Sequence, residues 1–358
     1  MYKLLRKALF KMNPETVHNR FTTVGHLLGK TSFTRSLTGL LWDYENSLLH
    51  QEILGIKFRN PVGLSAGFDY NAKLVQILPS VGFGFVEVGS VTARPCKGNE
   101  GPTLHRLPKD KSIIVYKGLK NDGIDVIVRR LESYKKKIPV GLSIARTNSI
   151  EVTDDMALKD WAYSYYEAMN SSANYVTINI SCPNAFSGLK FTDPTQFEML
   201  MKELRKIDKK KPVFIKISPD LNDNHLKELV ELSLNFQVDG FITTNLSKDR
   251  TGLTTDKNEL DNFKGGHSGK PISLKSLDTL KKVKKLVPED LPLISVGGIF
   301  SPYDAFERLE NGASLVQLIT GMIYEGPGLI SNINQGLVAL LKEKGYKNLS
   351  ELTHNPLY

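Results

Sequence analysis

The sequence predicts a single (β/α)8 barrel that follows an N-terminal helical extension. Eight short apolar runs, rich in β-branched residues, alternate with segments of helical character along the 358 residues. Near-continuous apolar runs are typical of strands buried on both faces of a parallel sheet, and repeated strand–helix alternation over this length indicates a closed barrel. A doubly wound open sheet is the alternative that the same alternation allows.

The predicted strands follow one another from residue 60 to residue 321. They cover residues 60–67, 85–91, 139–145, 175–181, 212–218, 240–245, 292–299 and 314–321. Helices are expected over residues 124–137, 194–210 and 302–311. Asp193 is a suitable N-cap for the second helix, and Gly312 follows the third, as glycine commonly does after a last helical turn.

Two connections between predicted strands are too long for a simple strand–helix unit. They cover residues 92–138 and 246–291. Each follows a strand, so each lies at the carboxyl end of the barrel, where the active sites of this fold are found. We expect both insertions to cover the site of a barrel domain that spans residues 51–358.

Residues 1–50 have a different pattern. Leu4, Leu5, Ala8, Leu9 and Met12 follow helical spacing with basic residues between them, and further apolar stretches cover residues 21–28 and 36–49. Charges recur too often for the core of a signal peptide. Basic amphipathic helices of this kind lie on an anionic membrane surface or cap an apolar tunnel. The alternative is a helix that only packs on the barrel.

The composition excludes several classes of protein. Two cysteines exclude a disulfide scaffold, and no apolar run approaches the roughly 20 residues of a membrane-spanning helix. The excess of 47 Lys and Arg over 38 Asp and Glu favours anionic partners. These basic residues are dispersed, so we expect no nucleic-acid binding. The seven histidines show no ligand spacing, so we expect no metal site.

Glycines at the ends of the last two predicted strands indicate a phosphate-bearing cofactor. The segments are Ser295–Ile299 (SVGGI) and Gln317–Gly321 (QLITG). Barrels often bind phosphate with the loops after these two strands, where backbone amides freed by glycine approach the anion. Ordinary turn geometry is the alternative explanation of these glycines.

The fourth predicted strand ends in the sequence NISCPN, residues 179–184, which places polar groups at the barrel mouth. Cys182 begins the loop, and a thiol with an ordinary pKa near 8.5 can act as a base or nucleophile near neutral pH. Asn179 and Asn184 supply donors and acceptors that suit a planar ring with imide-like groups. An inert buried cysteine is the alternative.

Two further polar residues end the next two predicted strands. Lys216 lies in an apolar run, and Asn245 ends the following one. A lysine within a buried strand is costly unless it is paired. A reduced flavin, which carries negative charge on its pyrimidine side, is a suitable anionic partner. An ion pair with a carboxylate of the barrel is the alternative.

Family motifs lie at residues 58–69, 82–92, 179–184, 216–220, 265–271 and 296–299, and at residues 13–18 (NPETVH). With these motifs the chain resembles, over nearly its whole length, the class 2, quinone-linked dihydroorotate dehydrogenases. The resemblance implies the FMN-binding barrel and an oxidation of (S)-dihydroorotate to orotate, with a quinone as acceptor, in pyrimidine biosynthesis.

The resemblance also implies roles for individual residues. FMN would be bound by Ala66, Gly67, Ser90, Ser143, Asn179, Lys216, Thr244, Gly269, Gly298, Ile319 and Thr320. The pyrimidine substrate would be held by Asn179, Asn184, Asn245 and Tyr70, with Cys182 as the base. His18 and Arg106 match positions along the quinone approach, which favours the tunnel hypothesis for residues 1–50. The family implies a peripheral membrane protein on the cytoplasmic face of the inner membrane.

The chain departs from the family pattern at several of these positions. The class 2 base is a serine, and Cys182 stands there; a lysine that contacts flavin and substrate is replaced by Tyr70. A substrate asparagine is replaced by Val115, a flavin-side asparagine by Ser143 and a tyrosine by Ile319.

The departures keep other hypotheses open. Lys117, close to the same loop, is a candidate to restore the positive charge that Tyr70 removes. A flavin barrel that acts on another small cyclic substrate would also show altered substrate positions beside an intact flavin site. A flavin-binding protein without catalysis is the third hypothesis, and retention of Cys182 beside the asparagines disfavours it.

Overall fold

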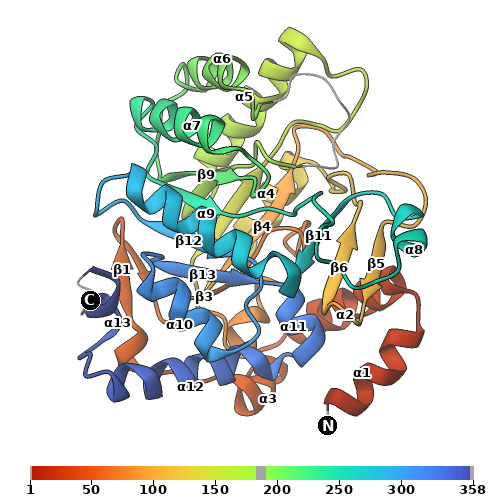
Figure 1. Ribbon diagram of the computed structural model, residues 1–358, viewed down its shortest axis with the longest axis vertical. Coiled ribbons are helices and arrows are strands. Elements are labelled where there is room, and N and C mark those ends of the chain that lie inside the picture. Colours follow the sequence, from red (N-terminus) through yellow and green to blue (C-terminus); the bar gives the residue numbers. More distant parts are fainter. Residues whose placement is uncertain (1, 183–190, 355–358) are drawn as a thin grey trace.

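The computed structural model, which describes residues 2–182 and 191–354, is a closed barrel of parallel strands surrounded by helices (Figure 1). The strands pair in the order β10-β12-β13-β3-β4-β7-β8-β9, with β9 again beside β10. Their bounds are β3 Val62–Leu64, β4 Phe85–Val91, β7 Val140–Ile144, β8 Tyr175–Ile178, β9 Val213–Ile217, β10 Gly240–Thr243, β12 Leu293–Val296 and β13 Leu315–Leu318. The predicted barrel is therefore confirmed, and the open sheet is excluded.

Helices follow most of the barrel strands and cover their outer faces (Figure 1). They are α4 Ile124–Glu132, α5 Asp154–Asn170, α6 Pro194–Leu204, α7 Asp223–Asn235, α9 Ser273–Leu286, α10 Pro302–Glu310, α11 Thr320–Glu325, α12 Gly328–Glu343 and α13 Leu349–His354. The helices predicted from 124 and 194 end earlier than expected. Each closes with a tighter i→i+3 hydrogen bond, from Tyr134 to Leu131 and from Ile207 to Leu204.

A short hairpin closes the amino-terminal end of the barrel. It consists of β1 Gln51–Ile53 and β2 Ile56–Phe58, which pair in antiparallel fashion. Phe58 is buried and meets Phe85 edge to face at 5.4 Å between ring centroids. Together with Tyr175, Phe214, Ile242, Ile294 and Leu315 these two rings form an apolar cluster. Solvent is thus excluded from this end, and the polar site lies at the other.

The two long insertions meet in a small sheet beside the barrel mouth. The first contributes β5 Leu104–Leu107 and β6 Ser112–Val115, and the second contributes β11 Gly266–Gly269. The strands are antiparallel in the order β11-β6-β5, and Leu107 and Ile114 pack against Leu260 of α8 (Lys257–Asp261). Segments about 150 residues apart in sequence thereby form one sheet.

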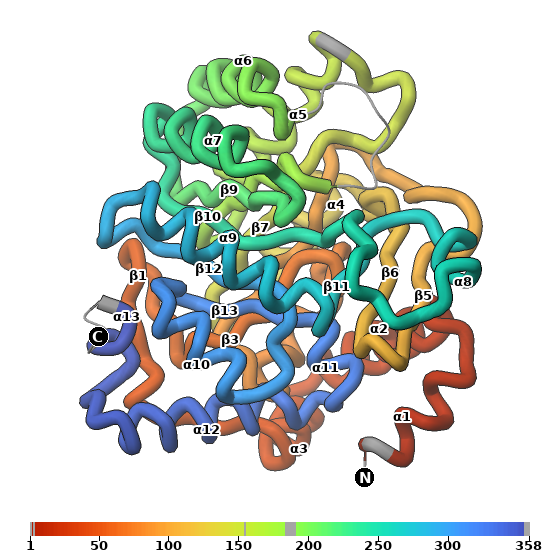
Figure 2. The backbone as a smooth tube through the Cα atoms, viewed as in Figure 1, coloured from red at the N-terminus to blue at the C-terminus, as the bar shows by residue number. Residues whose placement is uncertain are grey.

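The N-terminal extension forms three helices, α1 Tyr2–Lys11, α2 Pro14–Gly29 and α3 Ser32–Trp42. Asn13 caps α2, since its Oδ1 accepts hydrogen bonds from the amides of Glu15 and Thr16 at 3.0 Å. Helix α1 lies beside α11, where the hydroxyl of Tyr2 donates to the carbonyl of Ile323 at 2.6 Å. Helix α2 lies beside β5, and the red segment at the lower right of Figure 2 follows this path.

Helix α3 occupies a place that a barrel helix would normally fill. Between β3 and β4 the chain forms only the 3₁₀ turn η2, Leu78–Val81, and α3 packs against that turn. The contact is close, because a Cβ added at Gly82 would lie 2.9 Å from the carbonyl oxygen of Trp42. The extension is therefore integrated into the wall of the barrel domain.

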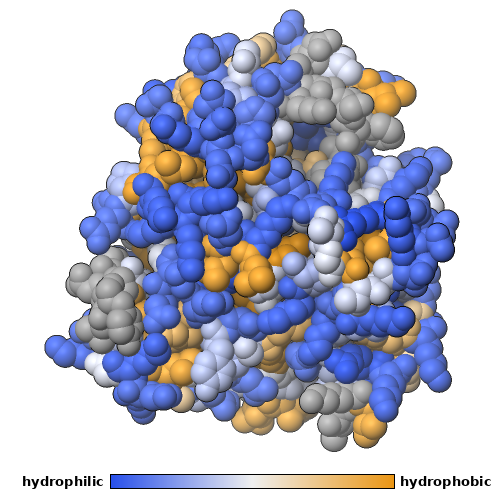
Figure 3. Space-filling model, in the orientation of Figure 1, coloured by the Kyte–Doolittle hydropathy of each residue, from blue (hydrophilic) through white to orange (hydrophobic). Residues whose placement is uncertain are grey.

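The outer faces of these three helices expose many apolar side chains. They are Leu4, Leu5, Phe21, Val24, Leu27, Phe33, Leu37, Leu40 and Leu41, which we call the apolar face. Part of it reaches the lower edge of Figure 3, where α3 lies in Figure 1. Among the described residues no helix is both long and apolar enough to cross a membrane.

Candidate functional site

One cavity of about 320 Å³ joins the carboxyl ends of the barrel strands to helices α1 and α2. Its inner wall includes Ser65, Asn179 and Lys216, and its outer wall includes Phe10 and His18. The sequence-predicted residues that border it are His18, Ala66, Gly67, Tyr70, Ser90, Arg106, Asn179, Cys182, Lys216, Thr244, Asn245, Gly269, Gly298, Ile319 and Thr320. Residues far apart in sequence meet here because the parallel strands all end at the same side.

Two predicted site residues have another placement. Ser143 is fully buried behind the wall, where its hydroxyl is 2.8 Å from that of Ser90. Its short side chain ends there, so Ser143 supports a cavity residue and does not border the cavity. Asn184 lies outside the described residues.

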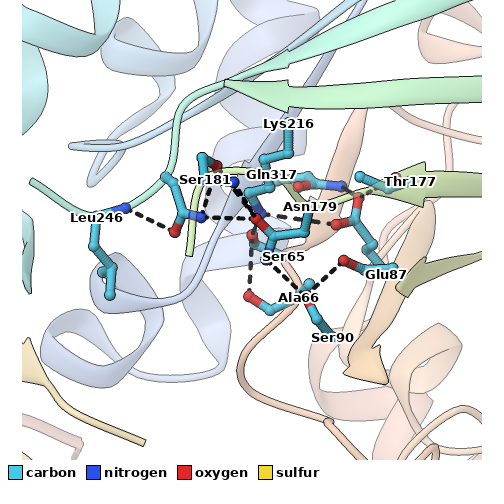
Figure 4. A network of polar contacts seen from close by, with 12 residues as sticks. Ser65, Ala66, Glu87, Ser90, Thr177, Asn179, Ser181, Lys216, Leu246 and Gln317 are labelled. Carbon is cyan, nitrogen blue, oxygen red and sulfur yellow. Dashed lines mark hydrogen bonds and ion pairs between the residues drawn. The ribbon is translucent and has the colours of Figure 1, made fainter. Parts of the chain in front are cut away.

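A buried ion pair stands at the base of the cavity (Figure 4). The Lys216 ammonium is 3.7 Å from Glu87 Oε1 and 3.2 Å from the hydroxyl of Ser65. Gln317 donates to the other oxygen of Glu87 at 2.9 Å, and Thr177 does so at 3.4 Å. Lys216 thus has the carboxylate partner that was the alternative to an anionic ligand, and it also borders the cavity.

Sequence reasoning missed Glu87 as a site residue. A signal was available, because Glu87 is a charged residue in the apolar run 85–91, as Lys216 is in its own run. Both charges are buried, and each makes the other tolerable in the barrel interior.

A chain of side-chain hydrogen bonds orients the amides above this pair (Figure 4). The Nδ2 of Asn179 donates to Ser90 Oγ at 2.7 Å. The Nδ2 of Asn245 donates to Asn179 Oδ1 at 3.1 Å and to Ser181 Oγ at 3.0 Å. Asn179 follows β8 and Asn245 follows β10. Asn179 Oδ1 also accepts from Ser181, and Asn245 Oδ1 accepts from the amide of Leu246, so the network fixes the orientation of both amides.

Cys182 follows this amide cluster directly. Its side chain is partly exposed and borders the cavity, whereas Cys96 is buried and lies elsewhere. A thiol beside oriented amides can remove a proton from a ring that those amides hold.

The glycine segments form a close-fitting part of the cavity wall. Gly269 has φ of 92° and Gly298 has φ of 75°, which side chains rarely adopt. A Cβ at Gly269 would lie 2.3 Å from the carbonyl oxygen of Lys111, and one at Gly298 would lie 2.4 Å from Ser273 Cβ. Bare backbone therefore faces the cavity here, as a phosphate group requires.

A stack of side chains lies between this mouth and α2. The ring of His18 is stacked on Tyr70 at 5.7 Å and meets Phe68 edge to face at 5.0 Å. The Lys117 ammonium lies 5.7 Å from the centre of the Tyr70 ring, on the cavity wall. Burial, with a smaller effect of Lys117, lowers the pKa of His18 to about 4, so the imidazole is neutral at pH 7.

Arg106 connects the cover sheet to the extension. Its guanidinium donates to the carbonyls of Leu9 at 3.3 Å and Met12 at 2.9 Å, and it lies 4.8 Å from the ring centre of Phe10. Arg106 and His18 thus border the outer part of the cavity, where the extension closes it.

Comparison with known proteins places this arrangement in a family. Residues 48–341 match the family model described as "Dihydroorotate dehydrogenase". The chain belongs to the dihydroorotate dehydrogenase family. It is 39% identical over 354 residues to a "Dihydroorotate dehydrogenase (quinone)" of Christiangramia forsetii, covering 96% of this chain and all of that one. A protein of the same name from Natronomonas pharaonis is 35% identical, with 98% of each chain covered.

Solved dihydroorotate dehydrogenases share the fold. The Eimeria tenella enzyme in complex with ferulenol superposes with a TM-score of 0.86 at 27% identity and covers 98% of this chain and 99% of its own. The ligand-free form of that enzyme gives a TM-score of 0.79 at 28% identity, covering 92% and 97%. The match with the quinone-type relatives extends over nearly the whole chain, so this oxidoreductase belongs to their class.

We predict that His18, half-buried and neutral at pH 7, makes stability depend on pH. The pKa of His18 is about 4 in the folded protein and about 6.5 in the unfolded chain, so the unfolded chain binds a proton first as the pH falls. This contribution to stability is complete above pH 6.5 and is lost toward pH 4, by about 2 kcal/mol at pH 5. The free energy of urea unfolding should therefore fall less between pH 7 and pH 5 in His18→Gln than in the parent protein.

The matched control is His225→Gln, on the exposed surface of α7, which should keep the parent's pH dependence. A His18→Gln protein that loses as much stability as the parent over this interval would contradict the assignment.

Proposed function

We propose that the protein oxidises (S)-dihydroorotate to orotate with FMN as cofactor and passes the electrons to a quinone, in pyrimidine biosynthesis. The observation that carries this proposal is the single cavity that connects Cys182 and the amide cluster with the apolar space beneath α1 and α2. One end suits a polar ring, and the other end suits an apolar acceptor.

The residues around the cavity fit FMN. The backbone at Gly269 and Gly298, with the hydroxyl of Thr320, would hold the phosphate. Lys216, held by Glu87 and Ser65, would supply positive charge to the pyrimidine side of the flavin ring. Ala66, Gly67, Ser90, Asn179, Thr244 and Ile319 would form the remaining ring wall. When bound, the flavin supplies a two-electron acceptor for hydride.

Cys182 would act as the base. Asn179 and Asn245 would orient the imide-like edge of the substrate, and the Cys182 sulfur would take the proton from the ring methylene. A thiol is far more acidic than the hydroxyl of a serine, so a larger fraction is ionised near neutral pH. Proton removal should therefore begin at lower pH than with serine at this position.

The altered residues favour one other candidate, a flavin barrel that acts on a different small cyclic substrate. Tyr70 and Val115 both border the cavity. Val115 has no hydrogen-bonding side chain, and the Tyr70 hydroxyl has no positive charge, whereas the family resemblance places an asparagine and a lysine there. Anaerobic mixing with dihydroorotate and with other substrates distinguishes this candidate from a flavin-binding protein without catalysis.

We predict that Cys182→Ala retains FMN but loses substrate-dependent flavin reduction. The loss should be at least about 100-fold, the usual contribution of a positioned general base. The measurement is anaerobic stopped-flow mixing with dihydroorotate, followed by the loss of flavin absorbance. Cys182→Ser should recover part of the rate, with its pH profile displaced to higher pH.

The matched control is Cys96→Ala, which removes the buried cysteine outside the cavity and should reduce at the parent rate. Normal reduction in Cys182→Ala would remove the thiol from the mechanism. Parent protein reduced only by another substrate would support the second candidate, and parent protein reduced by none would support the third.

We also propose that Lys117 provides the positive charge that Tyr70 does not. Its ammonium lies over the Tyr70 ring on the cavity wall, and burial lowers its pKa. Glu15 attracts this ammonium, but the Glu15 carboxylate accepts hydrogen bonds from Thr103.

Lys117→Met should therefore raise the KM for dihydroorotate about tenfold, as expected for a lost charged hydrogen bond, and leave the FMN content unchanged. Steady-state kinetics with a soluble quinone provide the measurement. Lys97→Met, on the exposed surface, is the matched control and should keep the parent KM. An unaltered KM in Lys117→Met would contradict the role proposed for Lys117.

The apolar face suggests how the quinone is reached. We propose that it rests on the membrane at the cytoplasmic face of the inner membrane, as a peripheral contact. Helices α1 and α2 border both this face and the outer end of the cavity, beside His18 and Arg106. A quinone could then pass from the lipid to the cavity between these helices.

Replacing Leu40 and Leu41 by serine should weaken binding to vesicles of phosphatidylethanolamine and phosphatidylglycerol several-fold, because both side chains are largely exposed on α3. Flavin reduction by dihydroorotate should be unchanged. Vesicle co-sedimentation gives the bound fraction. Leu274→Ser, which alters an equally exposed leucine on α9, is the control. Equal vesicle binding by the α3 variant and the parent would exclude this face as the contact.

A further inference from the structure

Arg308 is a buried cation without a carboxylate partner. It lies in α10, and its side chain is 0% exposed. One nitrogen, Nη2, donates to the carbonyl of Ser273 at 2.6 Å, to the hydroxyl of Ser273 at 3.0 Å and to the carbonyl of Gly297 at 3.2 Å. Within the described part of the chain, Nε and Nη1 have no hydrogen-bond partner.

Of the two acidic residues that act electrostatically on Arg308, Glu307 is exposed on the surface and Asp304 is engaged elsewhere. Asp304 binds the ammonium of Lys270 at 3.0 Å and the amide of Phe300 at 2.9 Å. Among the described residues, no carboxylate lies within ion-pair distance of Arg308. A guanidinium in this position has lost its water without gaining an anion, which is costly unless a ligand supplies the negative charge.

The contact with Gly297 determines the direction of the next amide. In a trans peptide the C=O of one residue and the N–H of the next point to opposite sides. Since the Gly297 carbonyl is turned toward Arg308, the Gly298 N–H is turned away from it. Gly297 and Gly298 both border the cavity, and no described group accepts a hydrogen bond from the Gly298 amide.

Close contacts restrict the conformation of the Gly297–Gly298 loop. Ser273 Cβ lies 2.4 Å from the position that a Gly298 Cβ would occupy, and Arg308 binds Ser273 as well as Gly297. Arg308 therefore joins the start of α9 to the glycine loop at the end of β12. It does not border the cavity itself.

We propose that Arg308 is a positioning residue for the phosphate of the flavin nucleotide. Arg308 binds the Gly297 carbonyl and thereby turns the Gly298 N–H toward the phosphate. Its positive charge also offsets the negative charge of the phosphate. The proposal rests on FMN as the cofactor. It requires the site to prefer FMN to riboflavin, which has the same ring without the phosphate, and it makes Arg308 a source of that preference.

The test is competition between the two flavins on the purified holoprotein. Equilibrium dialysis against mixtures of FMN and riboflavin, followed by chromatography of the released flavins, gives the ratio of bound FMN to bound riboflavin. Arg308→Met should lower this ratio at least tenfold. Arg308→Lys, which keeps the charge, should remain within about threefold of the parent. If Arg308→Met does not fold, Arg308→Gln tests the same loss of charge with the same expectation.

Arg59→Met is the matched control. Arg59 is a largely buried arginine that binds Asp43 and the carbonyl of Pro79, away from the cavity. This variant should lose thermal stability and keep the parent flavin ratio, so a purely structural effect is separated from a phosphate effect.

The possible failures are distinguishable. A parent-like ratio in the Arg308→Met or Arg308→Gln protein would overturn the role of Arg308 while leaving FMN in place. A parent protein that shows no preference for FMN would instead overturn the proposed cofactor.

Discussion

The ion pair between Lys216 and Glu87 constrains the whole interior of the barrel. A charge on one strand of a closed barrel can be tolerated only if the facing strand provides its opposite, and here β9 and β4 do so across the interior. Below the pair, aromatic and aliphatic side chains exclude water down to the β1–β2 hairpin. Above it, polar side chains such as Ser90, Asn179 and Asn245 border the cavity. The ion pair therefore lies between the apolar core of the barrel and the cavity at the barrel mouth.

Hydrogen bonds between side chains hold the polar groups at the barrel mouth in place. Asn179 is bound to Ser90, and Asn245 is bound to Asn179 and Ser181. Asn179 Oδ1 also accepts from Ser181, and Asn245 Oδ1 accepts from the amide of Leu246, so the protein holds both ends of each amide in a fixed orientation. Such mutual fixation explains how the wall tolerates Ser143, whose shorter side chain still supports Ser90 from behind.

Much of the fold could be predicted because the eight barrel strands are apolar, β-branched and separated by helices. The cover sheet could not, since β5 (LHRL) and β11 (GHSG) are not apolar runs and β11 pairs with β6, about 150 residues away. Asn179, Cys182, Lys216 and Asn245 were predictable from their residue type and their place at strand ends, whereas Ala66, Gly67 and Ser90 were expected from the family resemblance. Glu87 and Arg308 were not predicted, because their importance depends on which distant groups surround them. In sequence, Arg308 is an ordinary charged residue of an amphipathic helix, and only packing shows that it is buried.

The place of α3 has a consequence for the evolution of this protein. Because α3 substitutes for a wall helix beside η2, the chain before β1 is as much a part of the barrel domain as the helices that follow the strands. A descendant could lose α1 and α2 and keep this wall, although the outer end of the cavity would then be open. To shed α3 as well, it would first have to grow a new helix between β3 and β4.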